Sequence, residues 1–195
     1  MAHEDLRSIG GTYYVLRGLL LLPTGFLLIA AGLFNMPPMG NEAVGNSAPY
    51  FLVALVLGGL GYLAAHRYYA SRFGRVEPQG RMQRRVAVTT VLSAAVMALG
   101  ITVDFNADLP ISLYGVSFAC ALLTYYWVTI GLRSYHWAFL GGLALLSLLP
   151  VWGGFADKTS MAMIPMGVAC LGVGWFDHQE LVRSFTRLRG VDAHA

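Results

Sequence analysis

The sequence predicts an all-α polytopic membrane protein with six transmembrane helices and with both chain ends in the cytoplasm (N-in/C-in). Three observations lead to this prediction. The composition is 56% hydrophobic but only 12% charged, whereas a soluble domain carries about 25% charged residues. Six long segments are almost entirely apolar, and the arginines are distributed very unevenly among the segments that connect them.

The spans follow from length and hydropathy. A transmembrane helix needs about 20 mostly apolar residues, and we predict spans at residues 18–36, 48–65, 86–103, 109–132, 137–156 and 159–176. The segments are apolar throughout and lack the alternation of a barrel strand. Pro23, Pro150 and Pro165 fall inside spans, where proline is tolerated and can mark a kink. Residues 1–195 are predicted to form a single membrane domain.

The orientation follows from the basic residues, because cytoplasmic loops carry an excess of Lys and Arg. With six spans, every arginine falls in the N-terminal segment, in the loops after the second and fourth spans, or in the C-terminal tail. The other side holds Lys158 together with Glu42, Asp104, Asp108 and Asp157. We therefore expect a multi-pass protein of the cell (inner) membrane. The net charge of +3 is then a topology signal that needs no nucleic-acid partner.

Two cytoplasmic segments are predicted to offer a binding surface. Residues 177–188 have the spacing of an amphipathic helix, and residues 67–85 form the longest basic loop. Aromatic and Arg side chains are favoured anchors at protein interfaces, although the same apolar rows would also suit a lipid surface. The predicted binding residues of these segments are Phe73, Arg75, Phe185 and Arg187.

Arg17 is a further candidate binding residue, at the start of the first span and beside Tyr13 and Tyr14. A guanidinium at this depth could hold a lipid phosphate or a substrate carboxylate. The alternative is an arginine that extends to the membrane interface without a specific ligand.

A metal or haem site is the third candidate. His66, His136, His178 and Asp177 all lie near the predicted inner ends of their helices. Imidazole and carboxylate groups suit transition metals, but the spacing is not a known metal signature, and the alternative is a set of unconnected interfacial residues. No cofactor is predicted.

Residues 104–108 read Asp-Phe-Asn-Ala-Asp, which matches the first ligands of a calcium loop. The later positions of that motif are absent, since Leu109 stands where glycine is needed and Gly115 where glutamate is needed. The alternative interpretation is a tight turn, with Asp108 as the N-cap of the next helix and Pro110 in its first turn.

The functional prediction depends mostly on what the sequence lacks. No Asp, Glu, Lys or Arg lies within a span, which argues against a proton- or sodium-driven carrier, and no P-loop is present. The leading hypothesis is a non-catalytic integral membrane subunit, either a transport component or an accessory protein of a larger complex. Its expected partners are the lipid bilayer, a protein at the cytoplasmic face, or further copies of itself. The alternatives are a membrane-bound enzyme or redox protein that uses the histidine site, and a passive oligomeric channel.

Overall fold

The computed structural model describes residues 13, 15–35, 44–73, 80–155 and 157–192. Within these ranges the chain is helical apart from short connections and contains no strand, so the all-α prediction is confirmed. The elements are a 3₁₀ turn η1 (Gly18–Leu20), α2 (Leu21–Phe34), α3 (Val44–Phe73), α4 (Gly80–Asn106), α5 (Leu113–Thr129), α6 (Ser134–His136), a π-helical turn η2 (Trp137–Gly141), α7 (Gly142–Leu148), a 3₁₀ turn η3 (Trp152–Gly154) and α8 (Lys158–Asp192).

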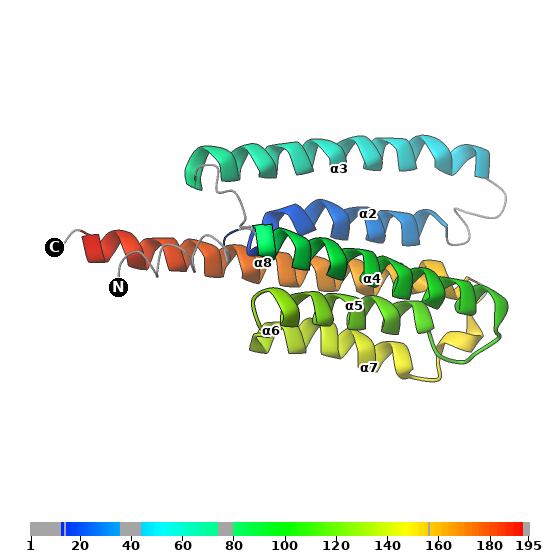
Figure 1. Ribbon diagram of the computed structural model, residues 1–195. Helices are drawn as coiled ribbons and strands as arrows, with labels where there is room; N and C mark the ends of the chain where they lie inside the picture. The colour runs from blue at the N-terminus through cyan, green and yellow to red at the C-terminus, as the bar shows by residue number, and fades with distance from the viewer. Residues whose placement is uncertain (1–12, 14, 36–43, 74–79, 156, 193–195) are drawn as a thin grey trace.

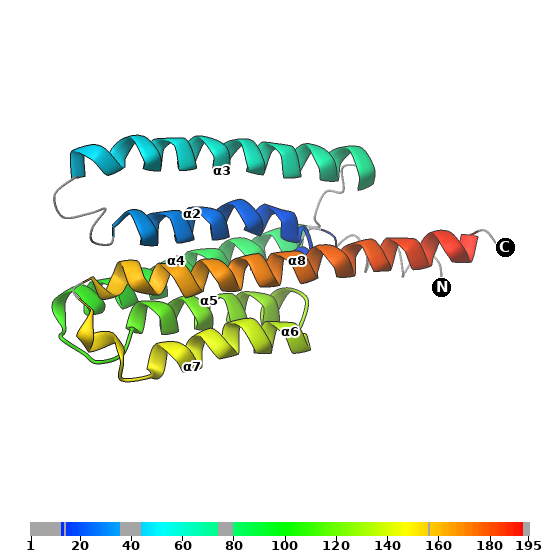
Figure 2. The ribbon, with the colours of Figure 1, turned by 180° about the vertical axis from the view of Figure 1, so that it is seen from behind.

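The helices lie side by side with nearly parallel axes (Figures 1 and 2). α3 forms one edge of the bundle and α6–α7 the opposite edge, and α2, α8, α4 and α5 lie between them. α8 is the longest helix. It extends past its neighbours at the end of the bundle where α3 finishes and α4 begins.

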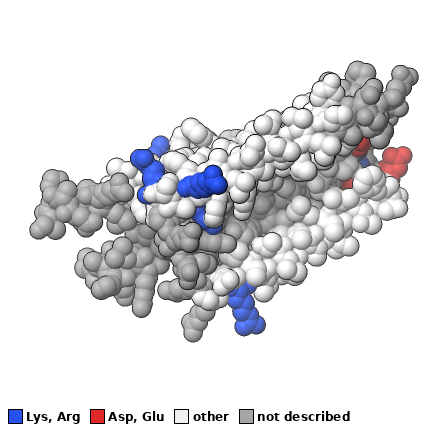
Figure 3. All heavy atoms as spheres, turned by 90° about the horizontal axis from the view of Figure 1, so that it is seen from above, with Lys and Arg blue, Asp and Glu red and all other residues white. Residues whose placement is uncertain are grey.

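The two ends of this bundle differ in charge, as Figure 3 shows for one face. Basic side chains lie toward one end and acidic side chains at the other, and an uncharged surface separates them. We call these the arginine end and the carboxylate end. Among the described side chains, the arginine end has Arg17, Arg67, Arg72, Arg84, Arg85, Arg133 and Arg183, and the carboxylate end has Asp104, Asp108 and Asp157. The arginine end also has the carboxylates Asp177 and Glu180, and the carboxylate end has Lys158.

Among the described residues, three helical segments are long and apolar enough to cross a membrane: Pro49–Phe73, Met82–Asn106 and Lys158–Thr186. Gly18–Phe34 and Leu113–Thr129 are shorter apolar helices. Three of the six predicted spans, at residues 48–65, 86–103 and 159–176, thus fall within helices of sufficient length and hydropathy to cross a membrane.

The predicted fourth span, residues 109–132, begins later than expected. α5 starts at Leu113, and its N-cap is Ser112, whose hydroxyl accepts a hydrogen bond from the Gly115 amide at 3.2 Å. The prediction of Asp108 as N-cap and Pro110 in the first turn is therefore wrong. The carboxylate that does serve the start of this helix comes from α4, where Asp104 accepts hydrogen bonds from the Leu113 and Tyr114 amides, both at 2.9 Å.

The predicted fifth span, residues 137–156, ends early because Pro150 excludes its predecessor from the helical region. Leu149 accordingly has an extended conformation with ψ of 138°, and α7 ends at Leu148. The predicted sixth span and the amphipathic segment 177–188 form one uninterrupted helix, α8, which also accommodates Pro165.

Glycines spaced seven residues apart determine how α2 packs on α8. Gly18, Gly25 and Gly32 face Gly174, Gly167 and Ser160 in antiparallel order. A Cβ atom on Gly25 would lie 2.7 Å from the Gly167 carbonyl oxygen, and one on Gly167 would lie 2.5 Å from the Gly25 oxygen. Any larger residue would force the helices apart, so the two backbones touch directly, as in membrane helix pairs with small residues at the interface.

The main hydrophobic core lies between α8, α5 and the α6–α7 segment. Its buried members include Phe118 from α5, Leu140 and Leu143 from the π-turn and α7, and Met166 and Val173 from α8. α3, by contrast, packs chiefly on α2, and Ala54 is one of the few buried residues of its apolar part. Most of its apolar side chains, such as Leu52, are exposed.

Replacing Gly167 by alanine should destabilise the protein by about 1–3 kcal/mol, the usual effect of overpacking. Gly59→Ala is the matched control, because a Cβ there meets nothing within 4 Å and alanine favours a helix by about 1 kcal/mol over glycine. Thermal denaturation in detergent should therefore show a lower melting temperature for Gly167→Ala and an equal or higher one for Gly59→Ala. Equal melting temperatures for the two variants would contradict the close approach of α2 and α8.

Candidate functional site

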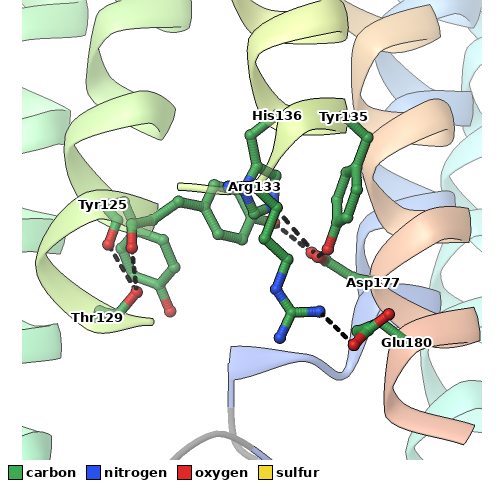
Figure 4. A network of polar contacts seen from close by, with 8 residues as sticks. Tyr125, Thr129, Arg133, Tyr135, His136, Asp177 and Glu180 are labelled. Carbon is green, nitrogen blue, oxygen red and sulfur yellow. Dashed lines mark hydrogen bonds and ion pairs between the residues drawn. The ribbon is translucent and has the colours of Figure 1, made fainter. Parts of the chain in front are cut away.

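A carboxylate buried at the arginine end is the most unusual polar group of the structure. Asp177, on α8, is fully buried and accepts three hydrogen bonds (Figure 4). The donors are the Tyr126 hydroxyl of α5 at 2.8 Å, the Tyr135 hydroxyl of α6 at 2.6 Å and Nε2 of His136 at 3.2 Å. The donors come from two segments, α5 and α6, so three helices meet at this carboxylate when α8 is included.

The tautomer of His136 follows from its second ring nitrogen. The backbone amide of Arg133 donates to Nδ1 of His136 at 3.1 Å, so this nitrogen is an acceptor and the proton lies on Nε2, facing Asp177. The ring also stacks on Tyr126, with centroids 4.0 Å apart and planes at 23°. A neutral imidazole thus satisfies every contact, and Asp177 acts as an acceptor in all three hydrogen bonds, which is the pattern of an ionised carboxylate.

The side of this cluster that faces the end of the bundle is less buried. Tyr135 is half-buried, and its burial, together with its hydrogen bond to Asp177, raises the pKa of its hydroxyl well above the ordinary value. The hydroxyl therefore remains a donor at physiological pH. Arg133 reaches across the same end to Glu180 of α8, with Nη1 and Oε1 3.1 Å apart (Figure 4). Because both side chains are about 30% exposed, this ion pair contributes at most about 1 kcal/mol.

The close packing of α2 on α8 also places Asp177. A Cβ on Gly18 would lie 2.7 Å from the Cβ of Asp177, so only glycine fits at this position without displacing Asp177. The buried carboxylate therefore lies at the end of the glycine interface, enclosed by η1 on one side and by its three donors on the other.

A second polar cluster ties α3 to the same end of the bundle. Tyr69 of α3 is fully buried; its hydroxyl accepts from the Leu19 amide at 3.0 Å and lies 3.1 Å from Nδ1 of His178. The Tyr13 hydroxyl donates to the Tyr69 carbonyl at 3.3 Å. These contacts attach the arginine-end part of α3, although most of the helix packs chiefly on α2.

The four predicted metal ligands do not come together at one place in the structure. Only His136 and Asp177 meet, His178 contacts Tyr69, and His66 is exposed on α3. Among the described residues, no group of three or more His, Cys, Asp or Glu side chains is arranged to hold a metal ion. The reason is geometric: His178 and Asp177 are consecutive on a helix, so their side chains point about 100° apart.

The predicted binding residues have different surroundings. Phe73 and Phe185 face each other, with ring centroids 4.8 Å apart, and both are half-buried. The contact between these rings joins α3 to α8 within the chain. Their predicted role in binding a partner stays a prediction. Arg75 lies outside the described residues, as does the side chain of Arg187.

Arg17 lines a cavity of about 450 Å³ between the start of α2, α4 and α5. The walls are mainly apolar, formed by residues such as Leu21, Met97 and Leu122, with Thr90 and Ser93 adding hydroxyl groups from α4. The Tyr125 and Tyr126 rings close the side toward α5. Arg17 therefore lies beside a cavity, and its role in binding stays a prediction.

Two other cavities differ in their chemistry. One of about 550 Å³, between α7 and α8, is lined by apolar and glycine residues, including Leu146, Ile164 and Val168. The other, of about 320 Å³, lies at the carboxylate end and is lined by Asp104, Asp108, Asp157 and Lys158 among other residues. Lys158 there contacts Asp104 at 3.2 Å, so the motif at residues 104–108 caps α5 and pairs with α8.

Sequence reasoning missed Tyr126 and Tyr135, and it took Asp177 as a candidate metal ligand or an interfacial residue. One signal for its burial was present. The buried stripe of α8 runs through Met166, Cys170, Val173, Asp177 and Leu181 at steps of three and four residues, which is the repeat of one helix face. Extending this stripe beyond the apolar run would have predicted the burial of Asp177. Its tyrosine donors come from other segments and leave no such trace.

Comparison with known proteins adds no family or fold assignment, since no protein-family model, curated protein or solved structure matches the chain.

Replacing Tyr126 by phenylalanine should lower stability by about 1.5–3 kcal/mol, the usual contribution of a hydrogen bond to a charged group. The Tyr50→Phe control removes a hydroxyl from a ring that is 64% exposed and should have little effect. In the double variant Tyr126→Phe/Asp177→Asn, the two losses should be less than additive, because both remove the same contact. Melting curves of the wild type, the Tyr126→Phe and Asp177→Asn single variants, the double variant and the Tyr50→Phe control test this. Full additivity would show that Tyr126 and Asp177 are not coupled.

Proposed function

We propose that the protein is a non-catalytic subunit of a larger membrane complex, either an accessory or a transport component. It crosses the inner membrane six times, and both ends of the chain and the arginine end of the bundle lie in the cytoplasm. The arrangement around Asp177 is the observation on which the proposal chiefly depends. A buried carboxylate whose three hydrogen-bond donors are all supplied by neighbouring segments fixes helices against one another and is suited to a scaffold.

Six crossings require that the shorter helices of the bundle also span the membrane. Gly18–Phe34 and Leu113–Thr129 have 17 residues each, which corresponds to about 25 Å at 1.5 Å per residue. This is a few ångströms short of a hydrocarbon core of about 30 Å. Both helices are packed among longer neighbours, and non-helical backbone is tolerated at membrane depth where protein surrounds it. The α6–α7 segment is interrupted by a π-turn and is packed in the same way against α5 and α8.

The orientation is supported by the separation of charge in Figure 3. All described arginines lie at the arginine end, and excess Arg marks the cytoplasmic side of membrane proteins. The long uncharged surface between the two ends has the character expected where lipid tails contact the protein.

The subunit role is supported by the shape of the arginine end. α8 extends past the rest of the bundle there (Figures 1 and 2), and Arg183 on this extension is exposed. Exposed Arg67 and Arg72 on α3 add to the same positive surface. A partner with an acidic face would complement it, because opposite potentials steer association and suppress wrong partners.

Cysteine labelling tests the six crossings. In a Cys120→Ser/Cys170→Ser background, a membrane-impermeant maleimide added to intact cells should label cysteine substitutions at Asp108 and Gly154. Substitutions at Arg84, Ser134 and Arg183 should react only after permeabilisation. Labelling of Ser134→Cys from outside would show that α5 or the α6–α7 segment does not cross the membrane. Labelling of Arg183→Cys from outside would show that the orientation is the opposite of the proposed one.

Site-specific photocrosslinking tests the subunit role. A photoreactive residue at Thr186, exposed on the α8 extension, should give a crosslink to one protein in its native membrane. The same residue at Phe105, which is 72% exposed at the carboxylate end, is the matched control and should give none. The Arg183→Glu substitution should weaken the Thr186 crosslink if charge steers the partner. Absence of any crosslink at Thr186 would contradict a subunit that docks through this surface.

A further inference from the structure

We infer that the cavity beside Arg17 is a binding site for one anionic phospholipid of the cytoplasmic leaflet. The phosphate contacts the Arg17 guanidinium, and an acyl chain lies along the apolar wall. This inference rests on the proposed membrane orientation, which places the arginine end at the level of the inner headgroups.

The position of Arg17 within the cavity is the first argument. It is the one charged residue among the described residues that line the cavity. It immediately precedes η1 at the arginine end, so the cation lies at one end of an otherwise mainly apolar wall. An amphiphile with a negative head and an apolar tail has the same polarity along its length.

The walls are the second argument. Leu21, Met97 and Leu122 provide apolar contact from α2, α4 and α5, respectively. The Tyr126 hydroxyl is already committed to Asp177, so its ring serves the cavity as an apolar surface. The Ser93 hydroxyl donates to the Ala121 carbonyl, at 3.4 Å. A small anion such as free phosphate would have to desolvate against these walls, whereas an acyl chain gains from contact with them.

The chemistry of the head group follows from the guanidinium. Arg pairs well with phosphate, because its planar fork can donate two parallel hydrogen bonds. A zwitterionic lipid also has a phosphate, but its own ammonium competes for it, so a net anionic head should bind more tightly. The volume of about 450 Å³ lies within the range of about 300–1,000 Å³ typical of small-molecule sites, enough for a head region and part of one chain.

The other cavities provide internal comparisons. The cavity between α7 and α8 has apolar walls without a charged lining residue, so it should accept acyl chains without regard to head-group charge. The cavity at the carboxylate end is lined by three aspartates and a lysine, which disfavours a phosphate. Only the Arg17 cavity, of these three, combines apolar walls with a cation as its sole charged group.

Native mass spectrometry of the full-length protein in mild detergent tests the inference with phosphatidylglycerol and phosphatidylcholine of identical chains. The wild type should retain one phosphatidylglycerol with about a tenfold preference, the equivalent of one hydrogen bond to a charged group. Arg17→Gln should lose this preference. Arg72→Gln, which removes an exposed arginine at the same end, should keep it. Ala94→Phe, which fills an exposed position of the wall, should reduce binding of both lipids at this site.

Three results would overturn the inference. A preference that survives Arg17→Gln would exclude Arg17 as the contact, and an equal loss in Arg72→Gln would reduce the effect to general surface charge. Displacement of phosphatidylglycerol by inorganic phosphate at equal concentration would identify a small-anion site instead. The measurement is independent of orientation and of protein partners, so its failure would leave the labelling and crosslinking results intact, and the reverse also holds.

Discussion

The direct contact between the backbones of α2 and α8 is the constraint on which the other features of this structure depend. Residues at intervals of seven, Gly18, Gly25 and Gly32, meet Gly174, Gly167 and Ser160, and no side chain separates the helices along this line. In a lipid environment hydrophobic burial does little to drive helices together, so close van der Waals contact over a long interface becomes the main attraction. With α2 held in this way, α8 can serve as the central helix on which α5 and α7 also pack.

The same contact determines where polar groups can be buried. Asp177 fits against Gly18 because glycine has no side chain at this position. The carboxylate is thereby enclosed with Tyr126, Tyr135 and His136. A buried charge is very costly unless it is fully hydrogen-bonded. Three donors meet this condition here, and they also make the relative positions of α5, α6 and α8 interdependent. At the other end, Asp104 plays a comparable part: it accepts from the first amides of α5 and pairs with Lys158 of α8.

Both ends of the bundle are thus held by carboxylates, while the middle is held by glycines and apolar packing. Over most of its length α3 packs chiefly on α2 and contacts neither carboxylate. At the arginine end it is attached by Tyr69 and by the Phe73–Phe185 pair. The cavity beside Arg17 lies on the other side of α2, where α4 approaches through its contacts with α5.

The sequence by itself determined that the protein is helical, which segments are apolar, and how charge divides between the two ends, because these properties depend on composition and local spacing. The burial of Asp177 could also have been inferred from the helical repeat of Met166, Cys170, Val173 and Leu181, whereas the role of Arg17 in binding stays a prediction. Helix ends were less predictable: α5 is capped by Ser112 and by a carboxylate from another helix, while α7 ends at a local proline effect. Only the tertiary structure decided that Tyr126, Tyr135 and His136 meet Asp177 while His178 turns to Tyr69. The physical reason is that hydrogen-bond partners between helices depend on the rotation and depth of each helix, and in this protein the backbone contact of α2 with α8 sets both.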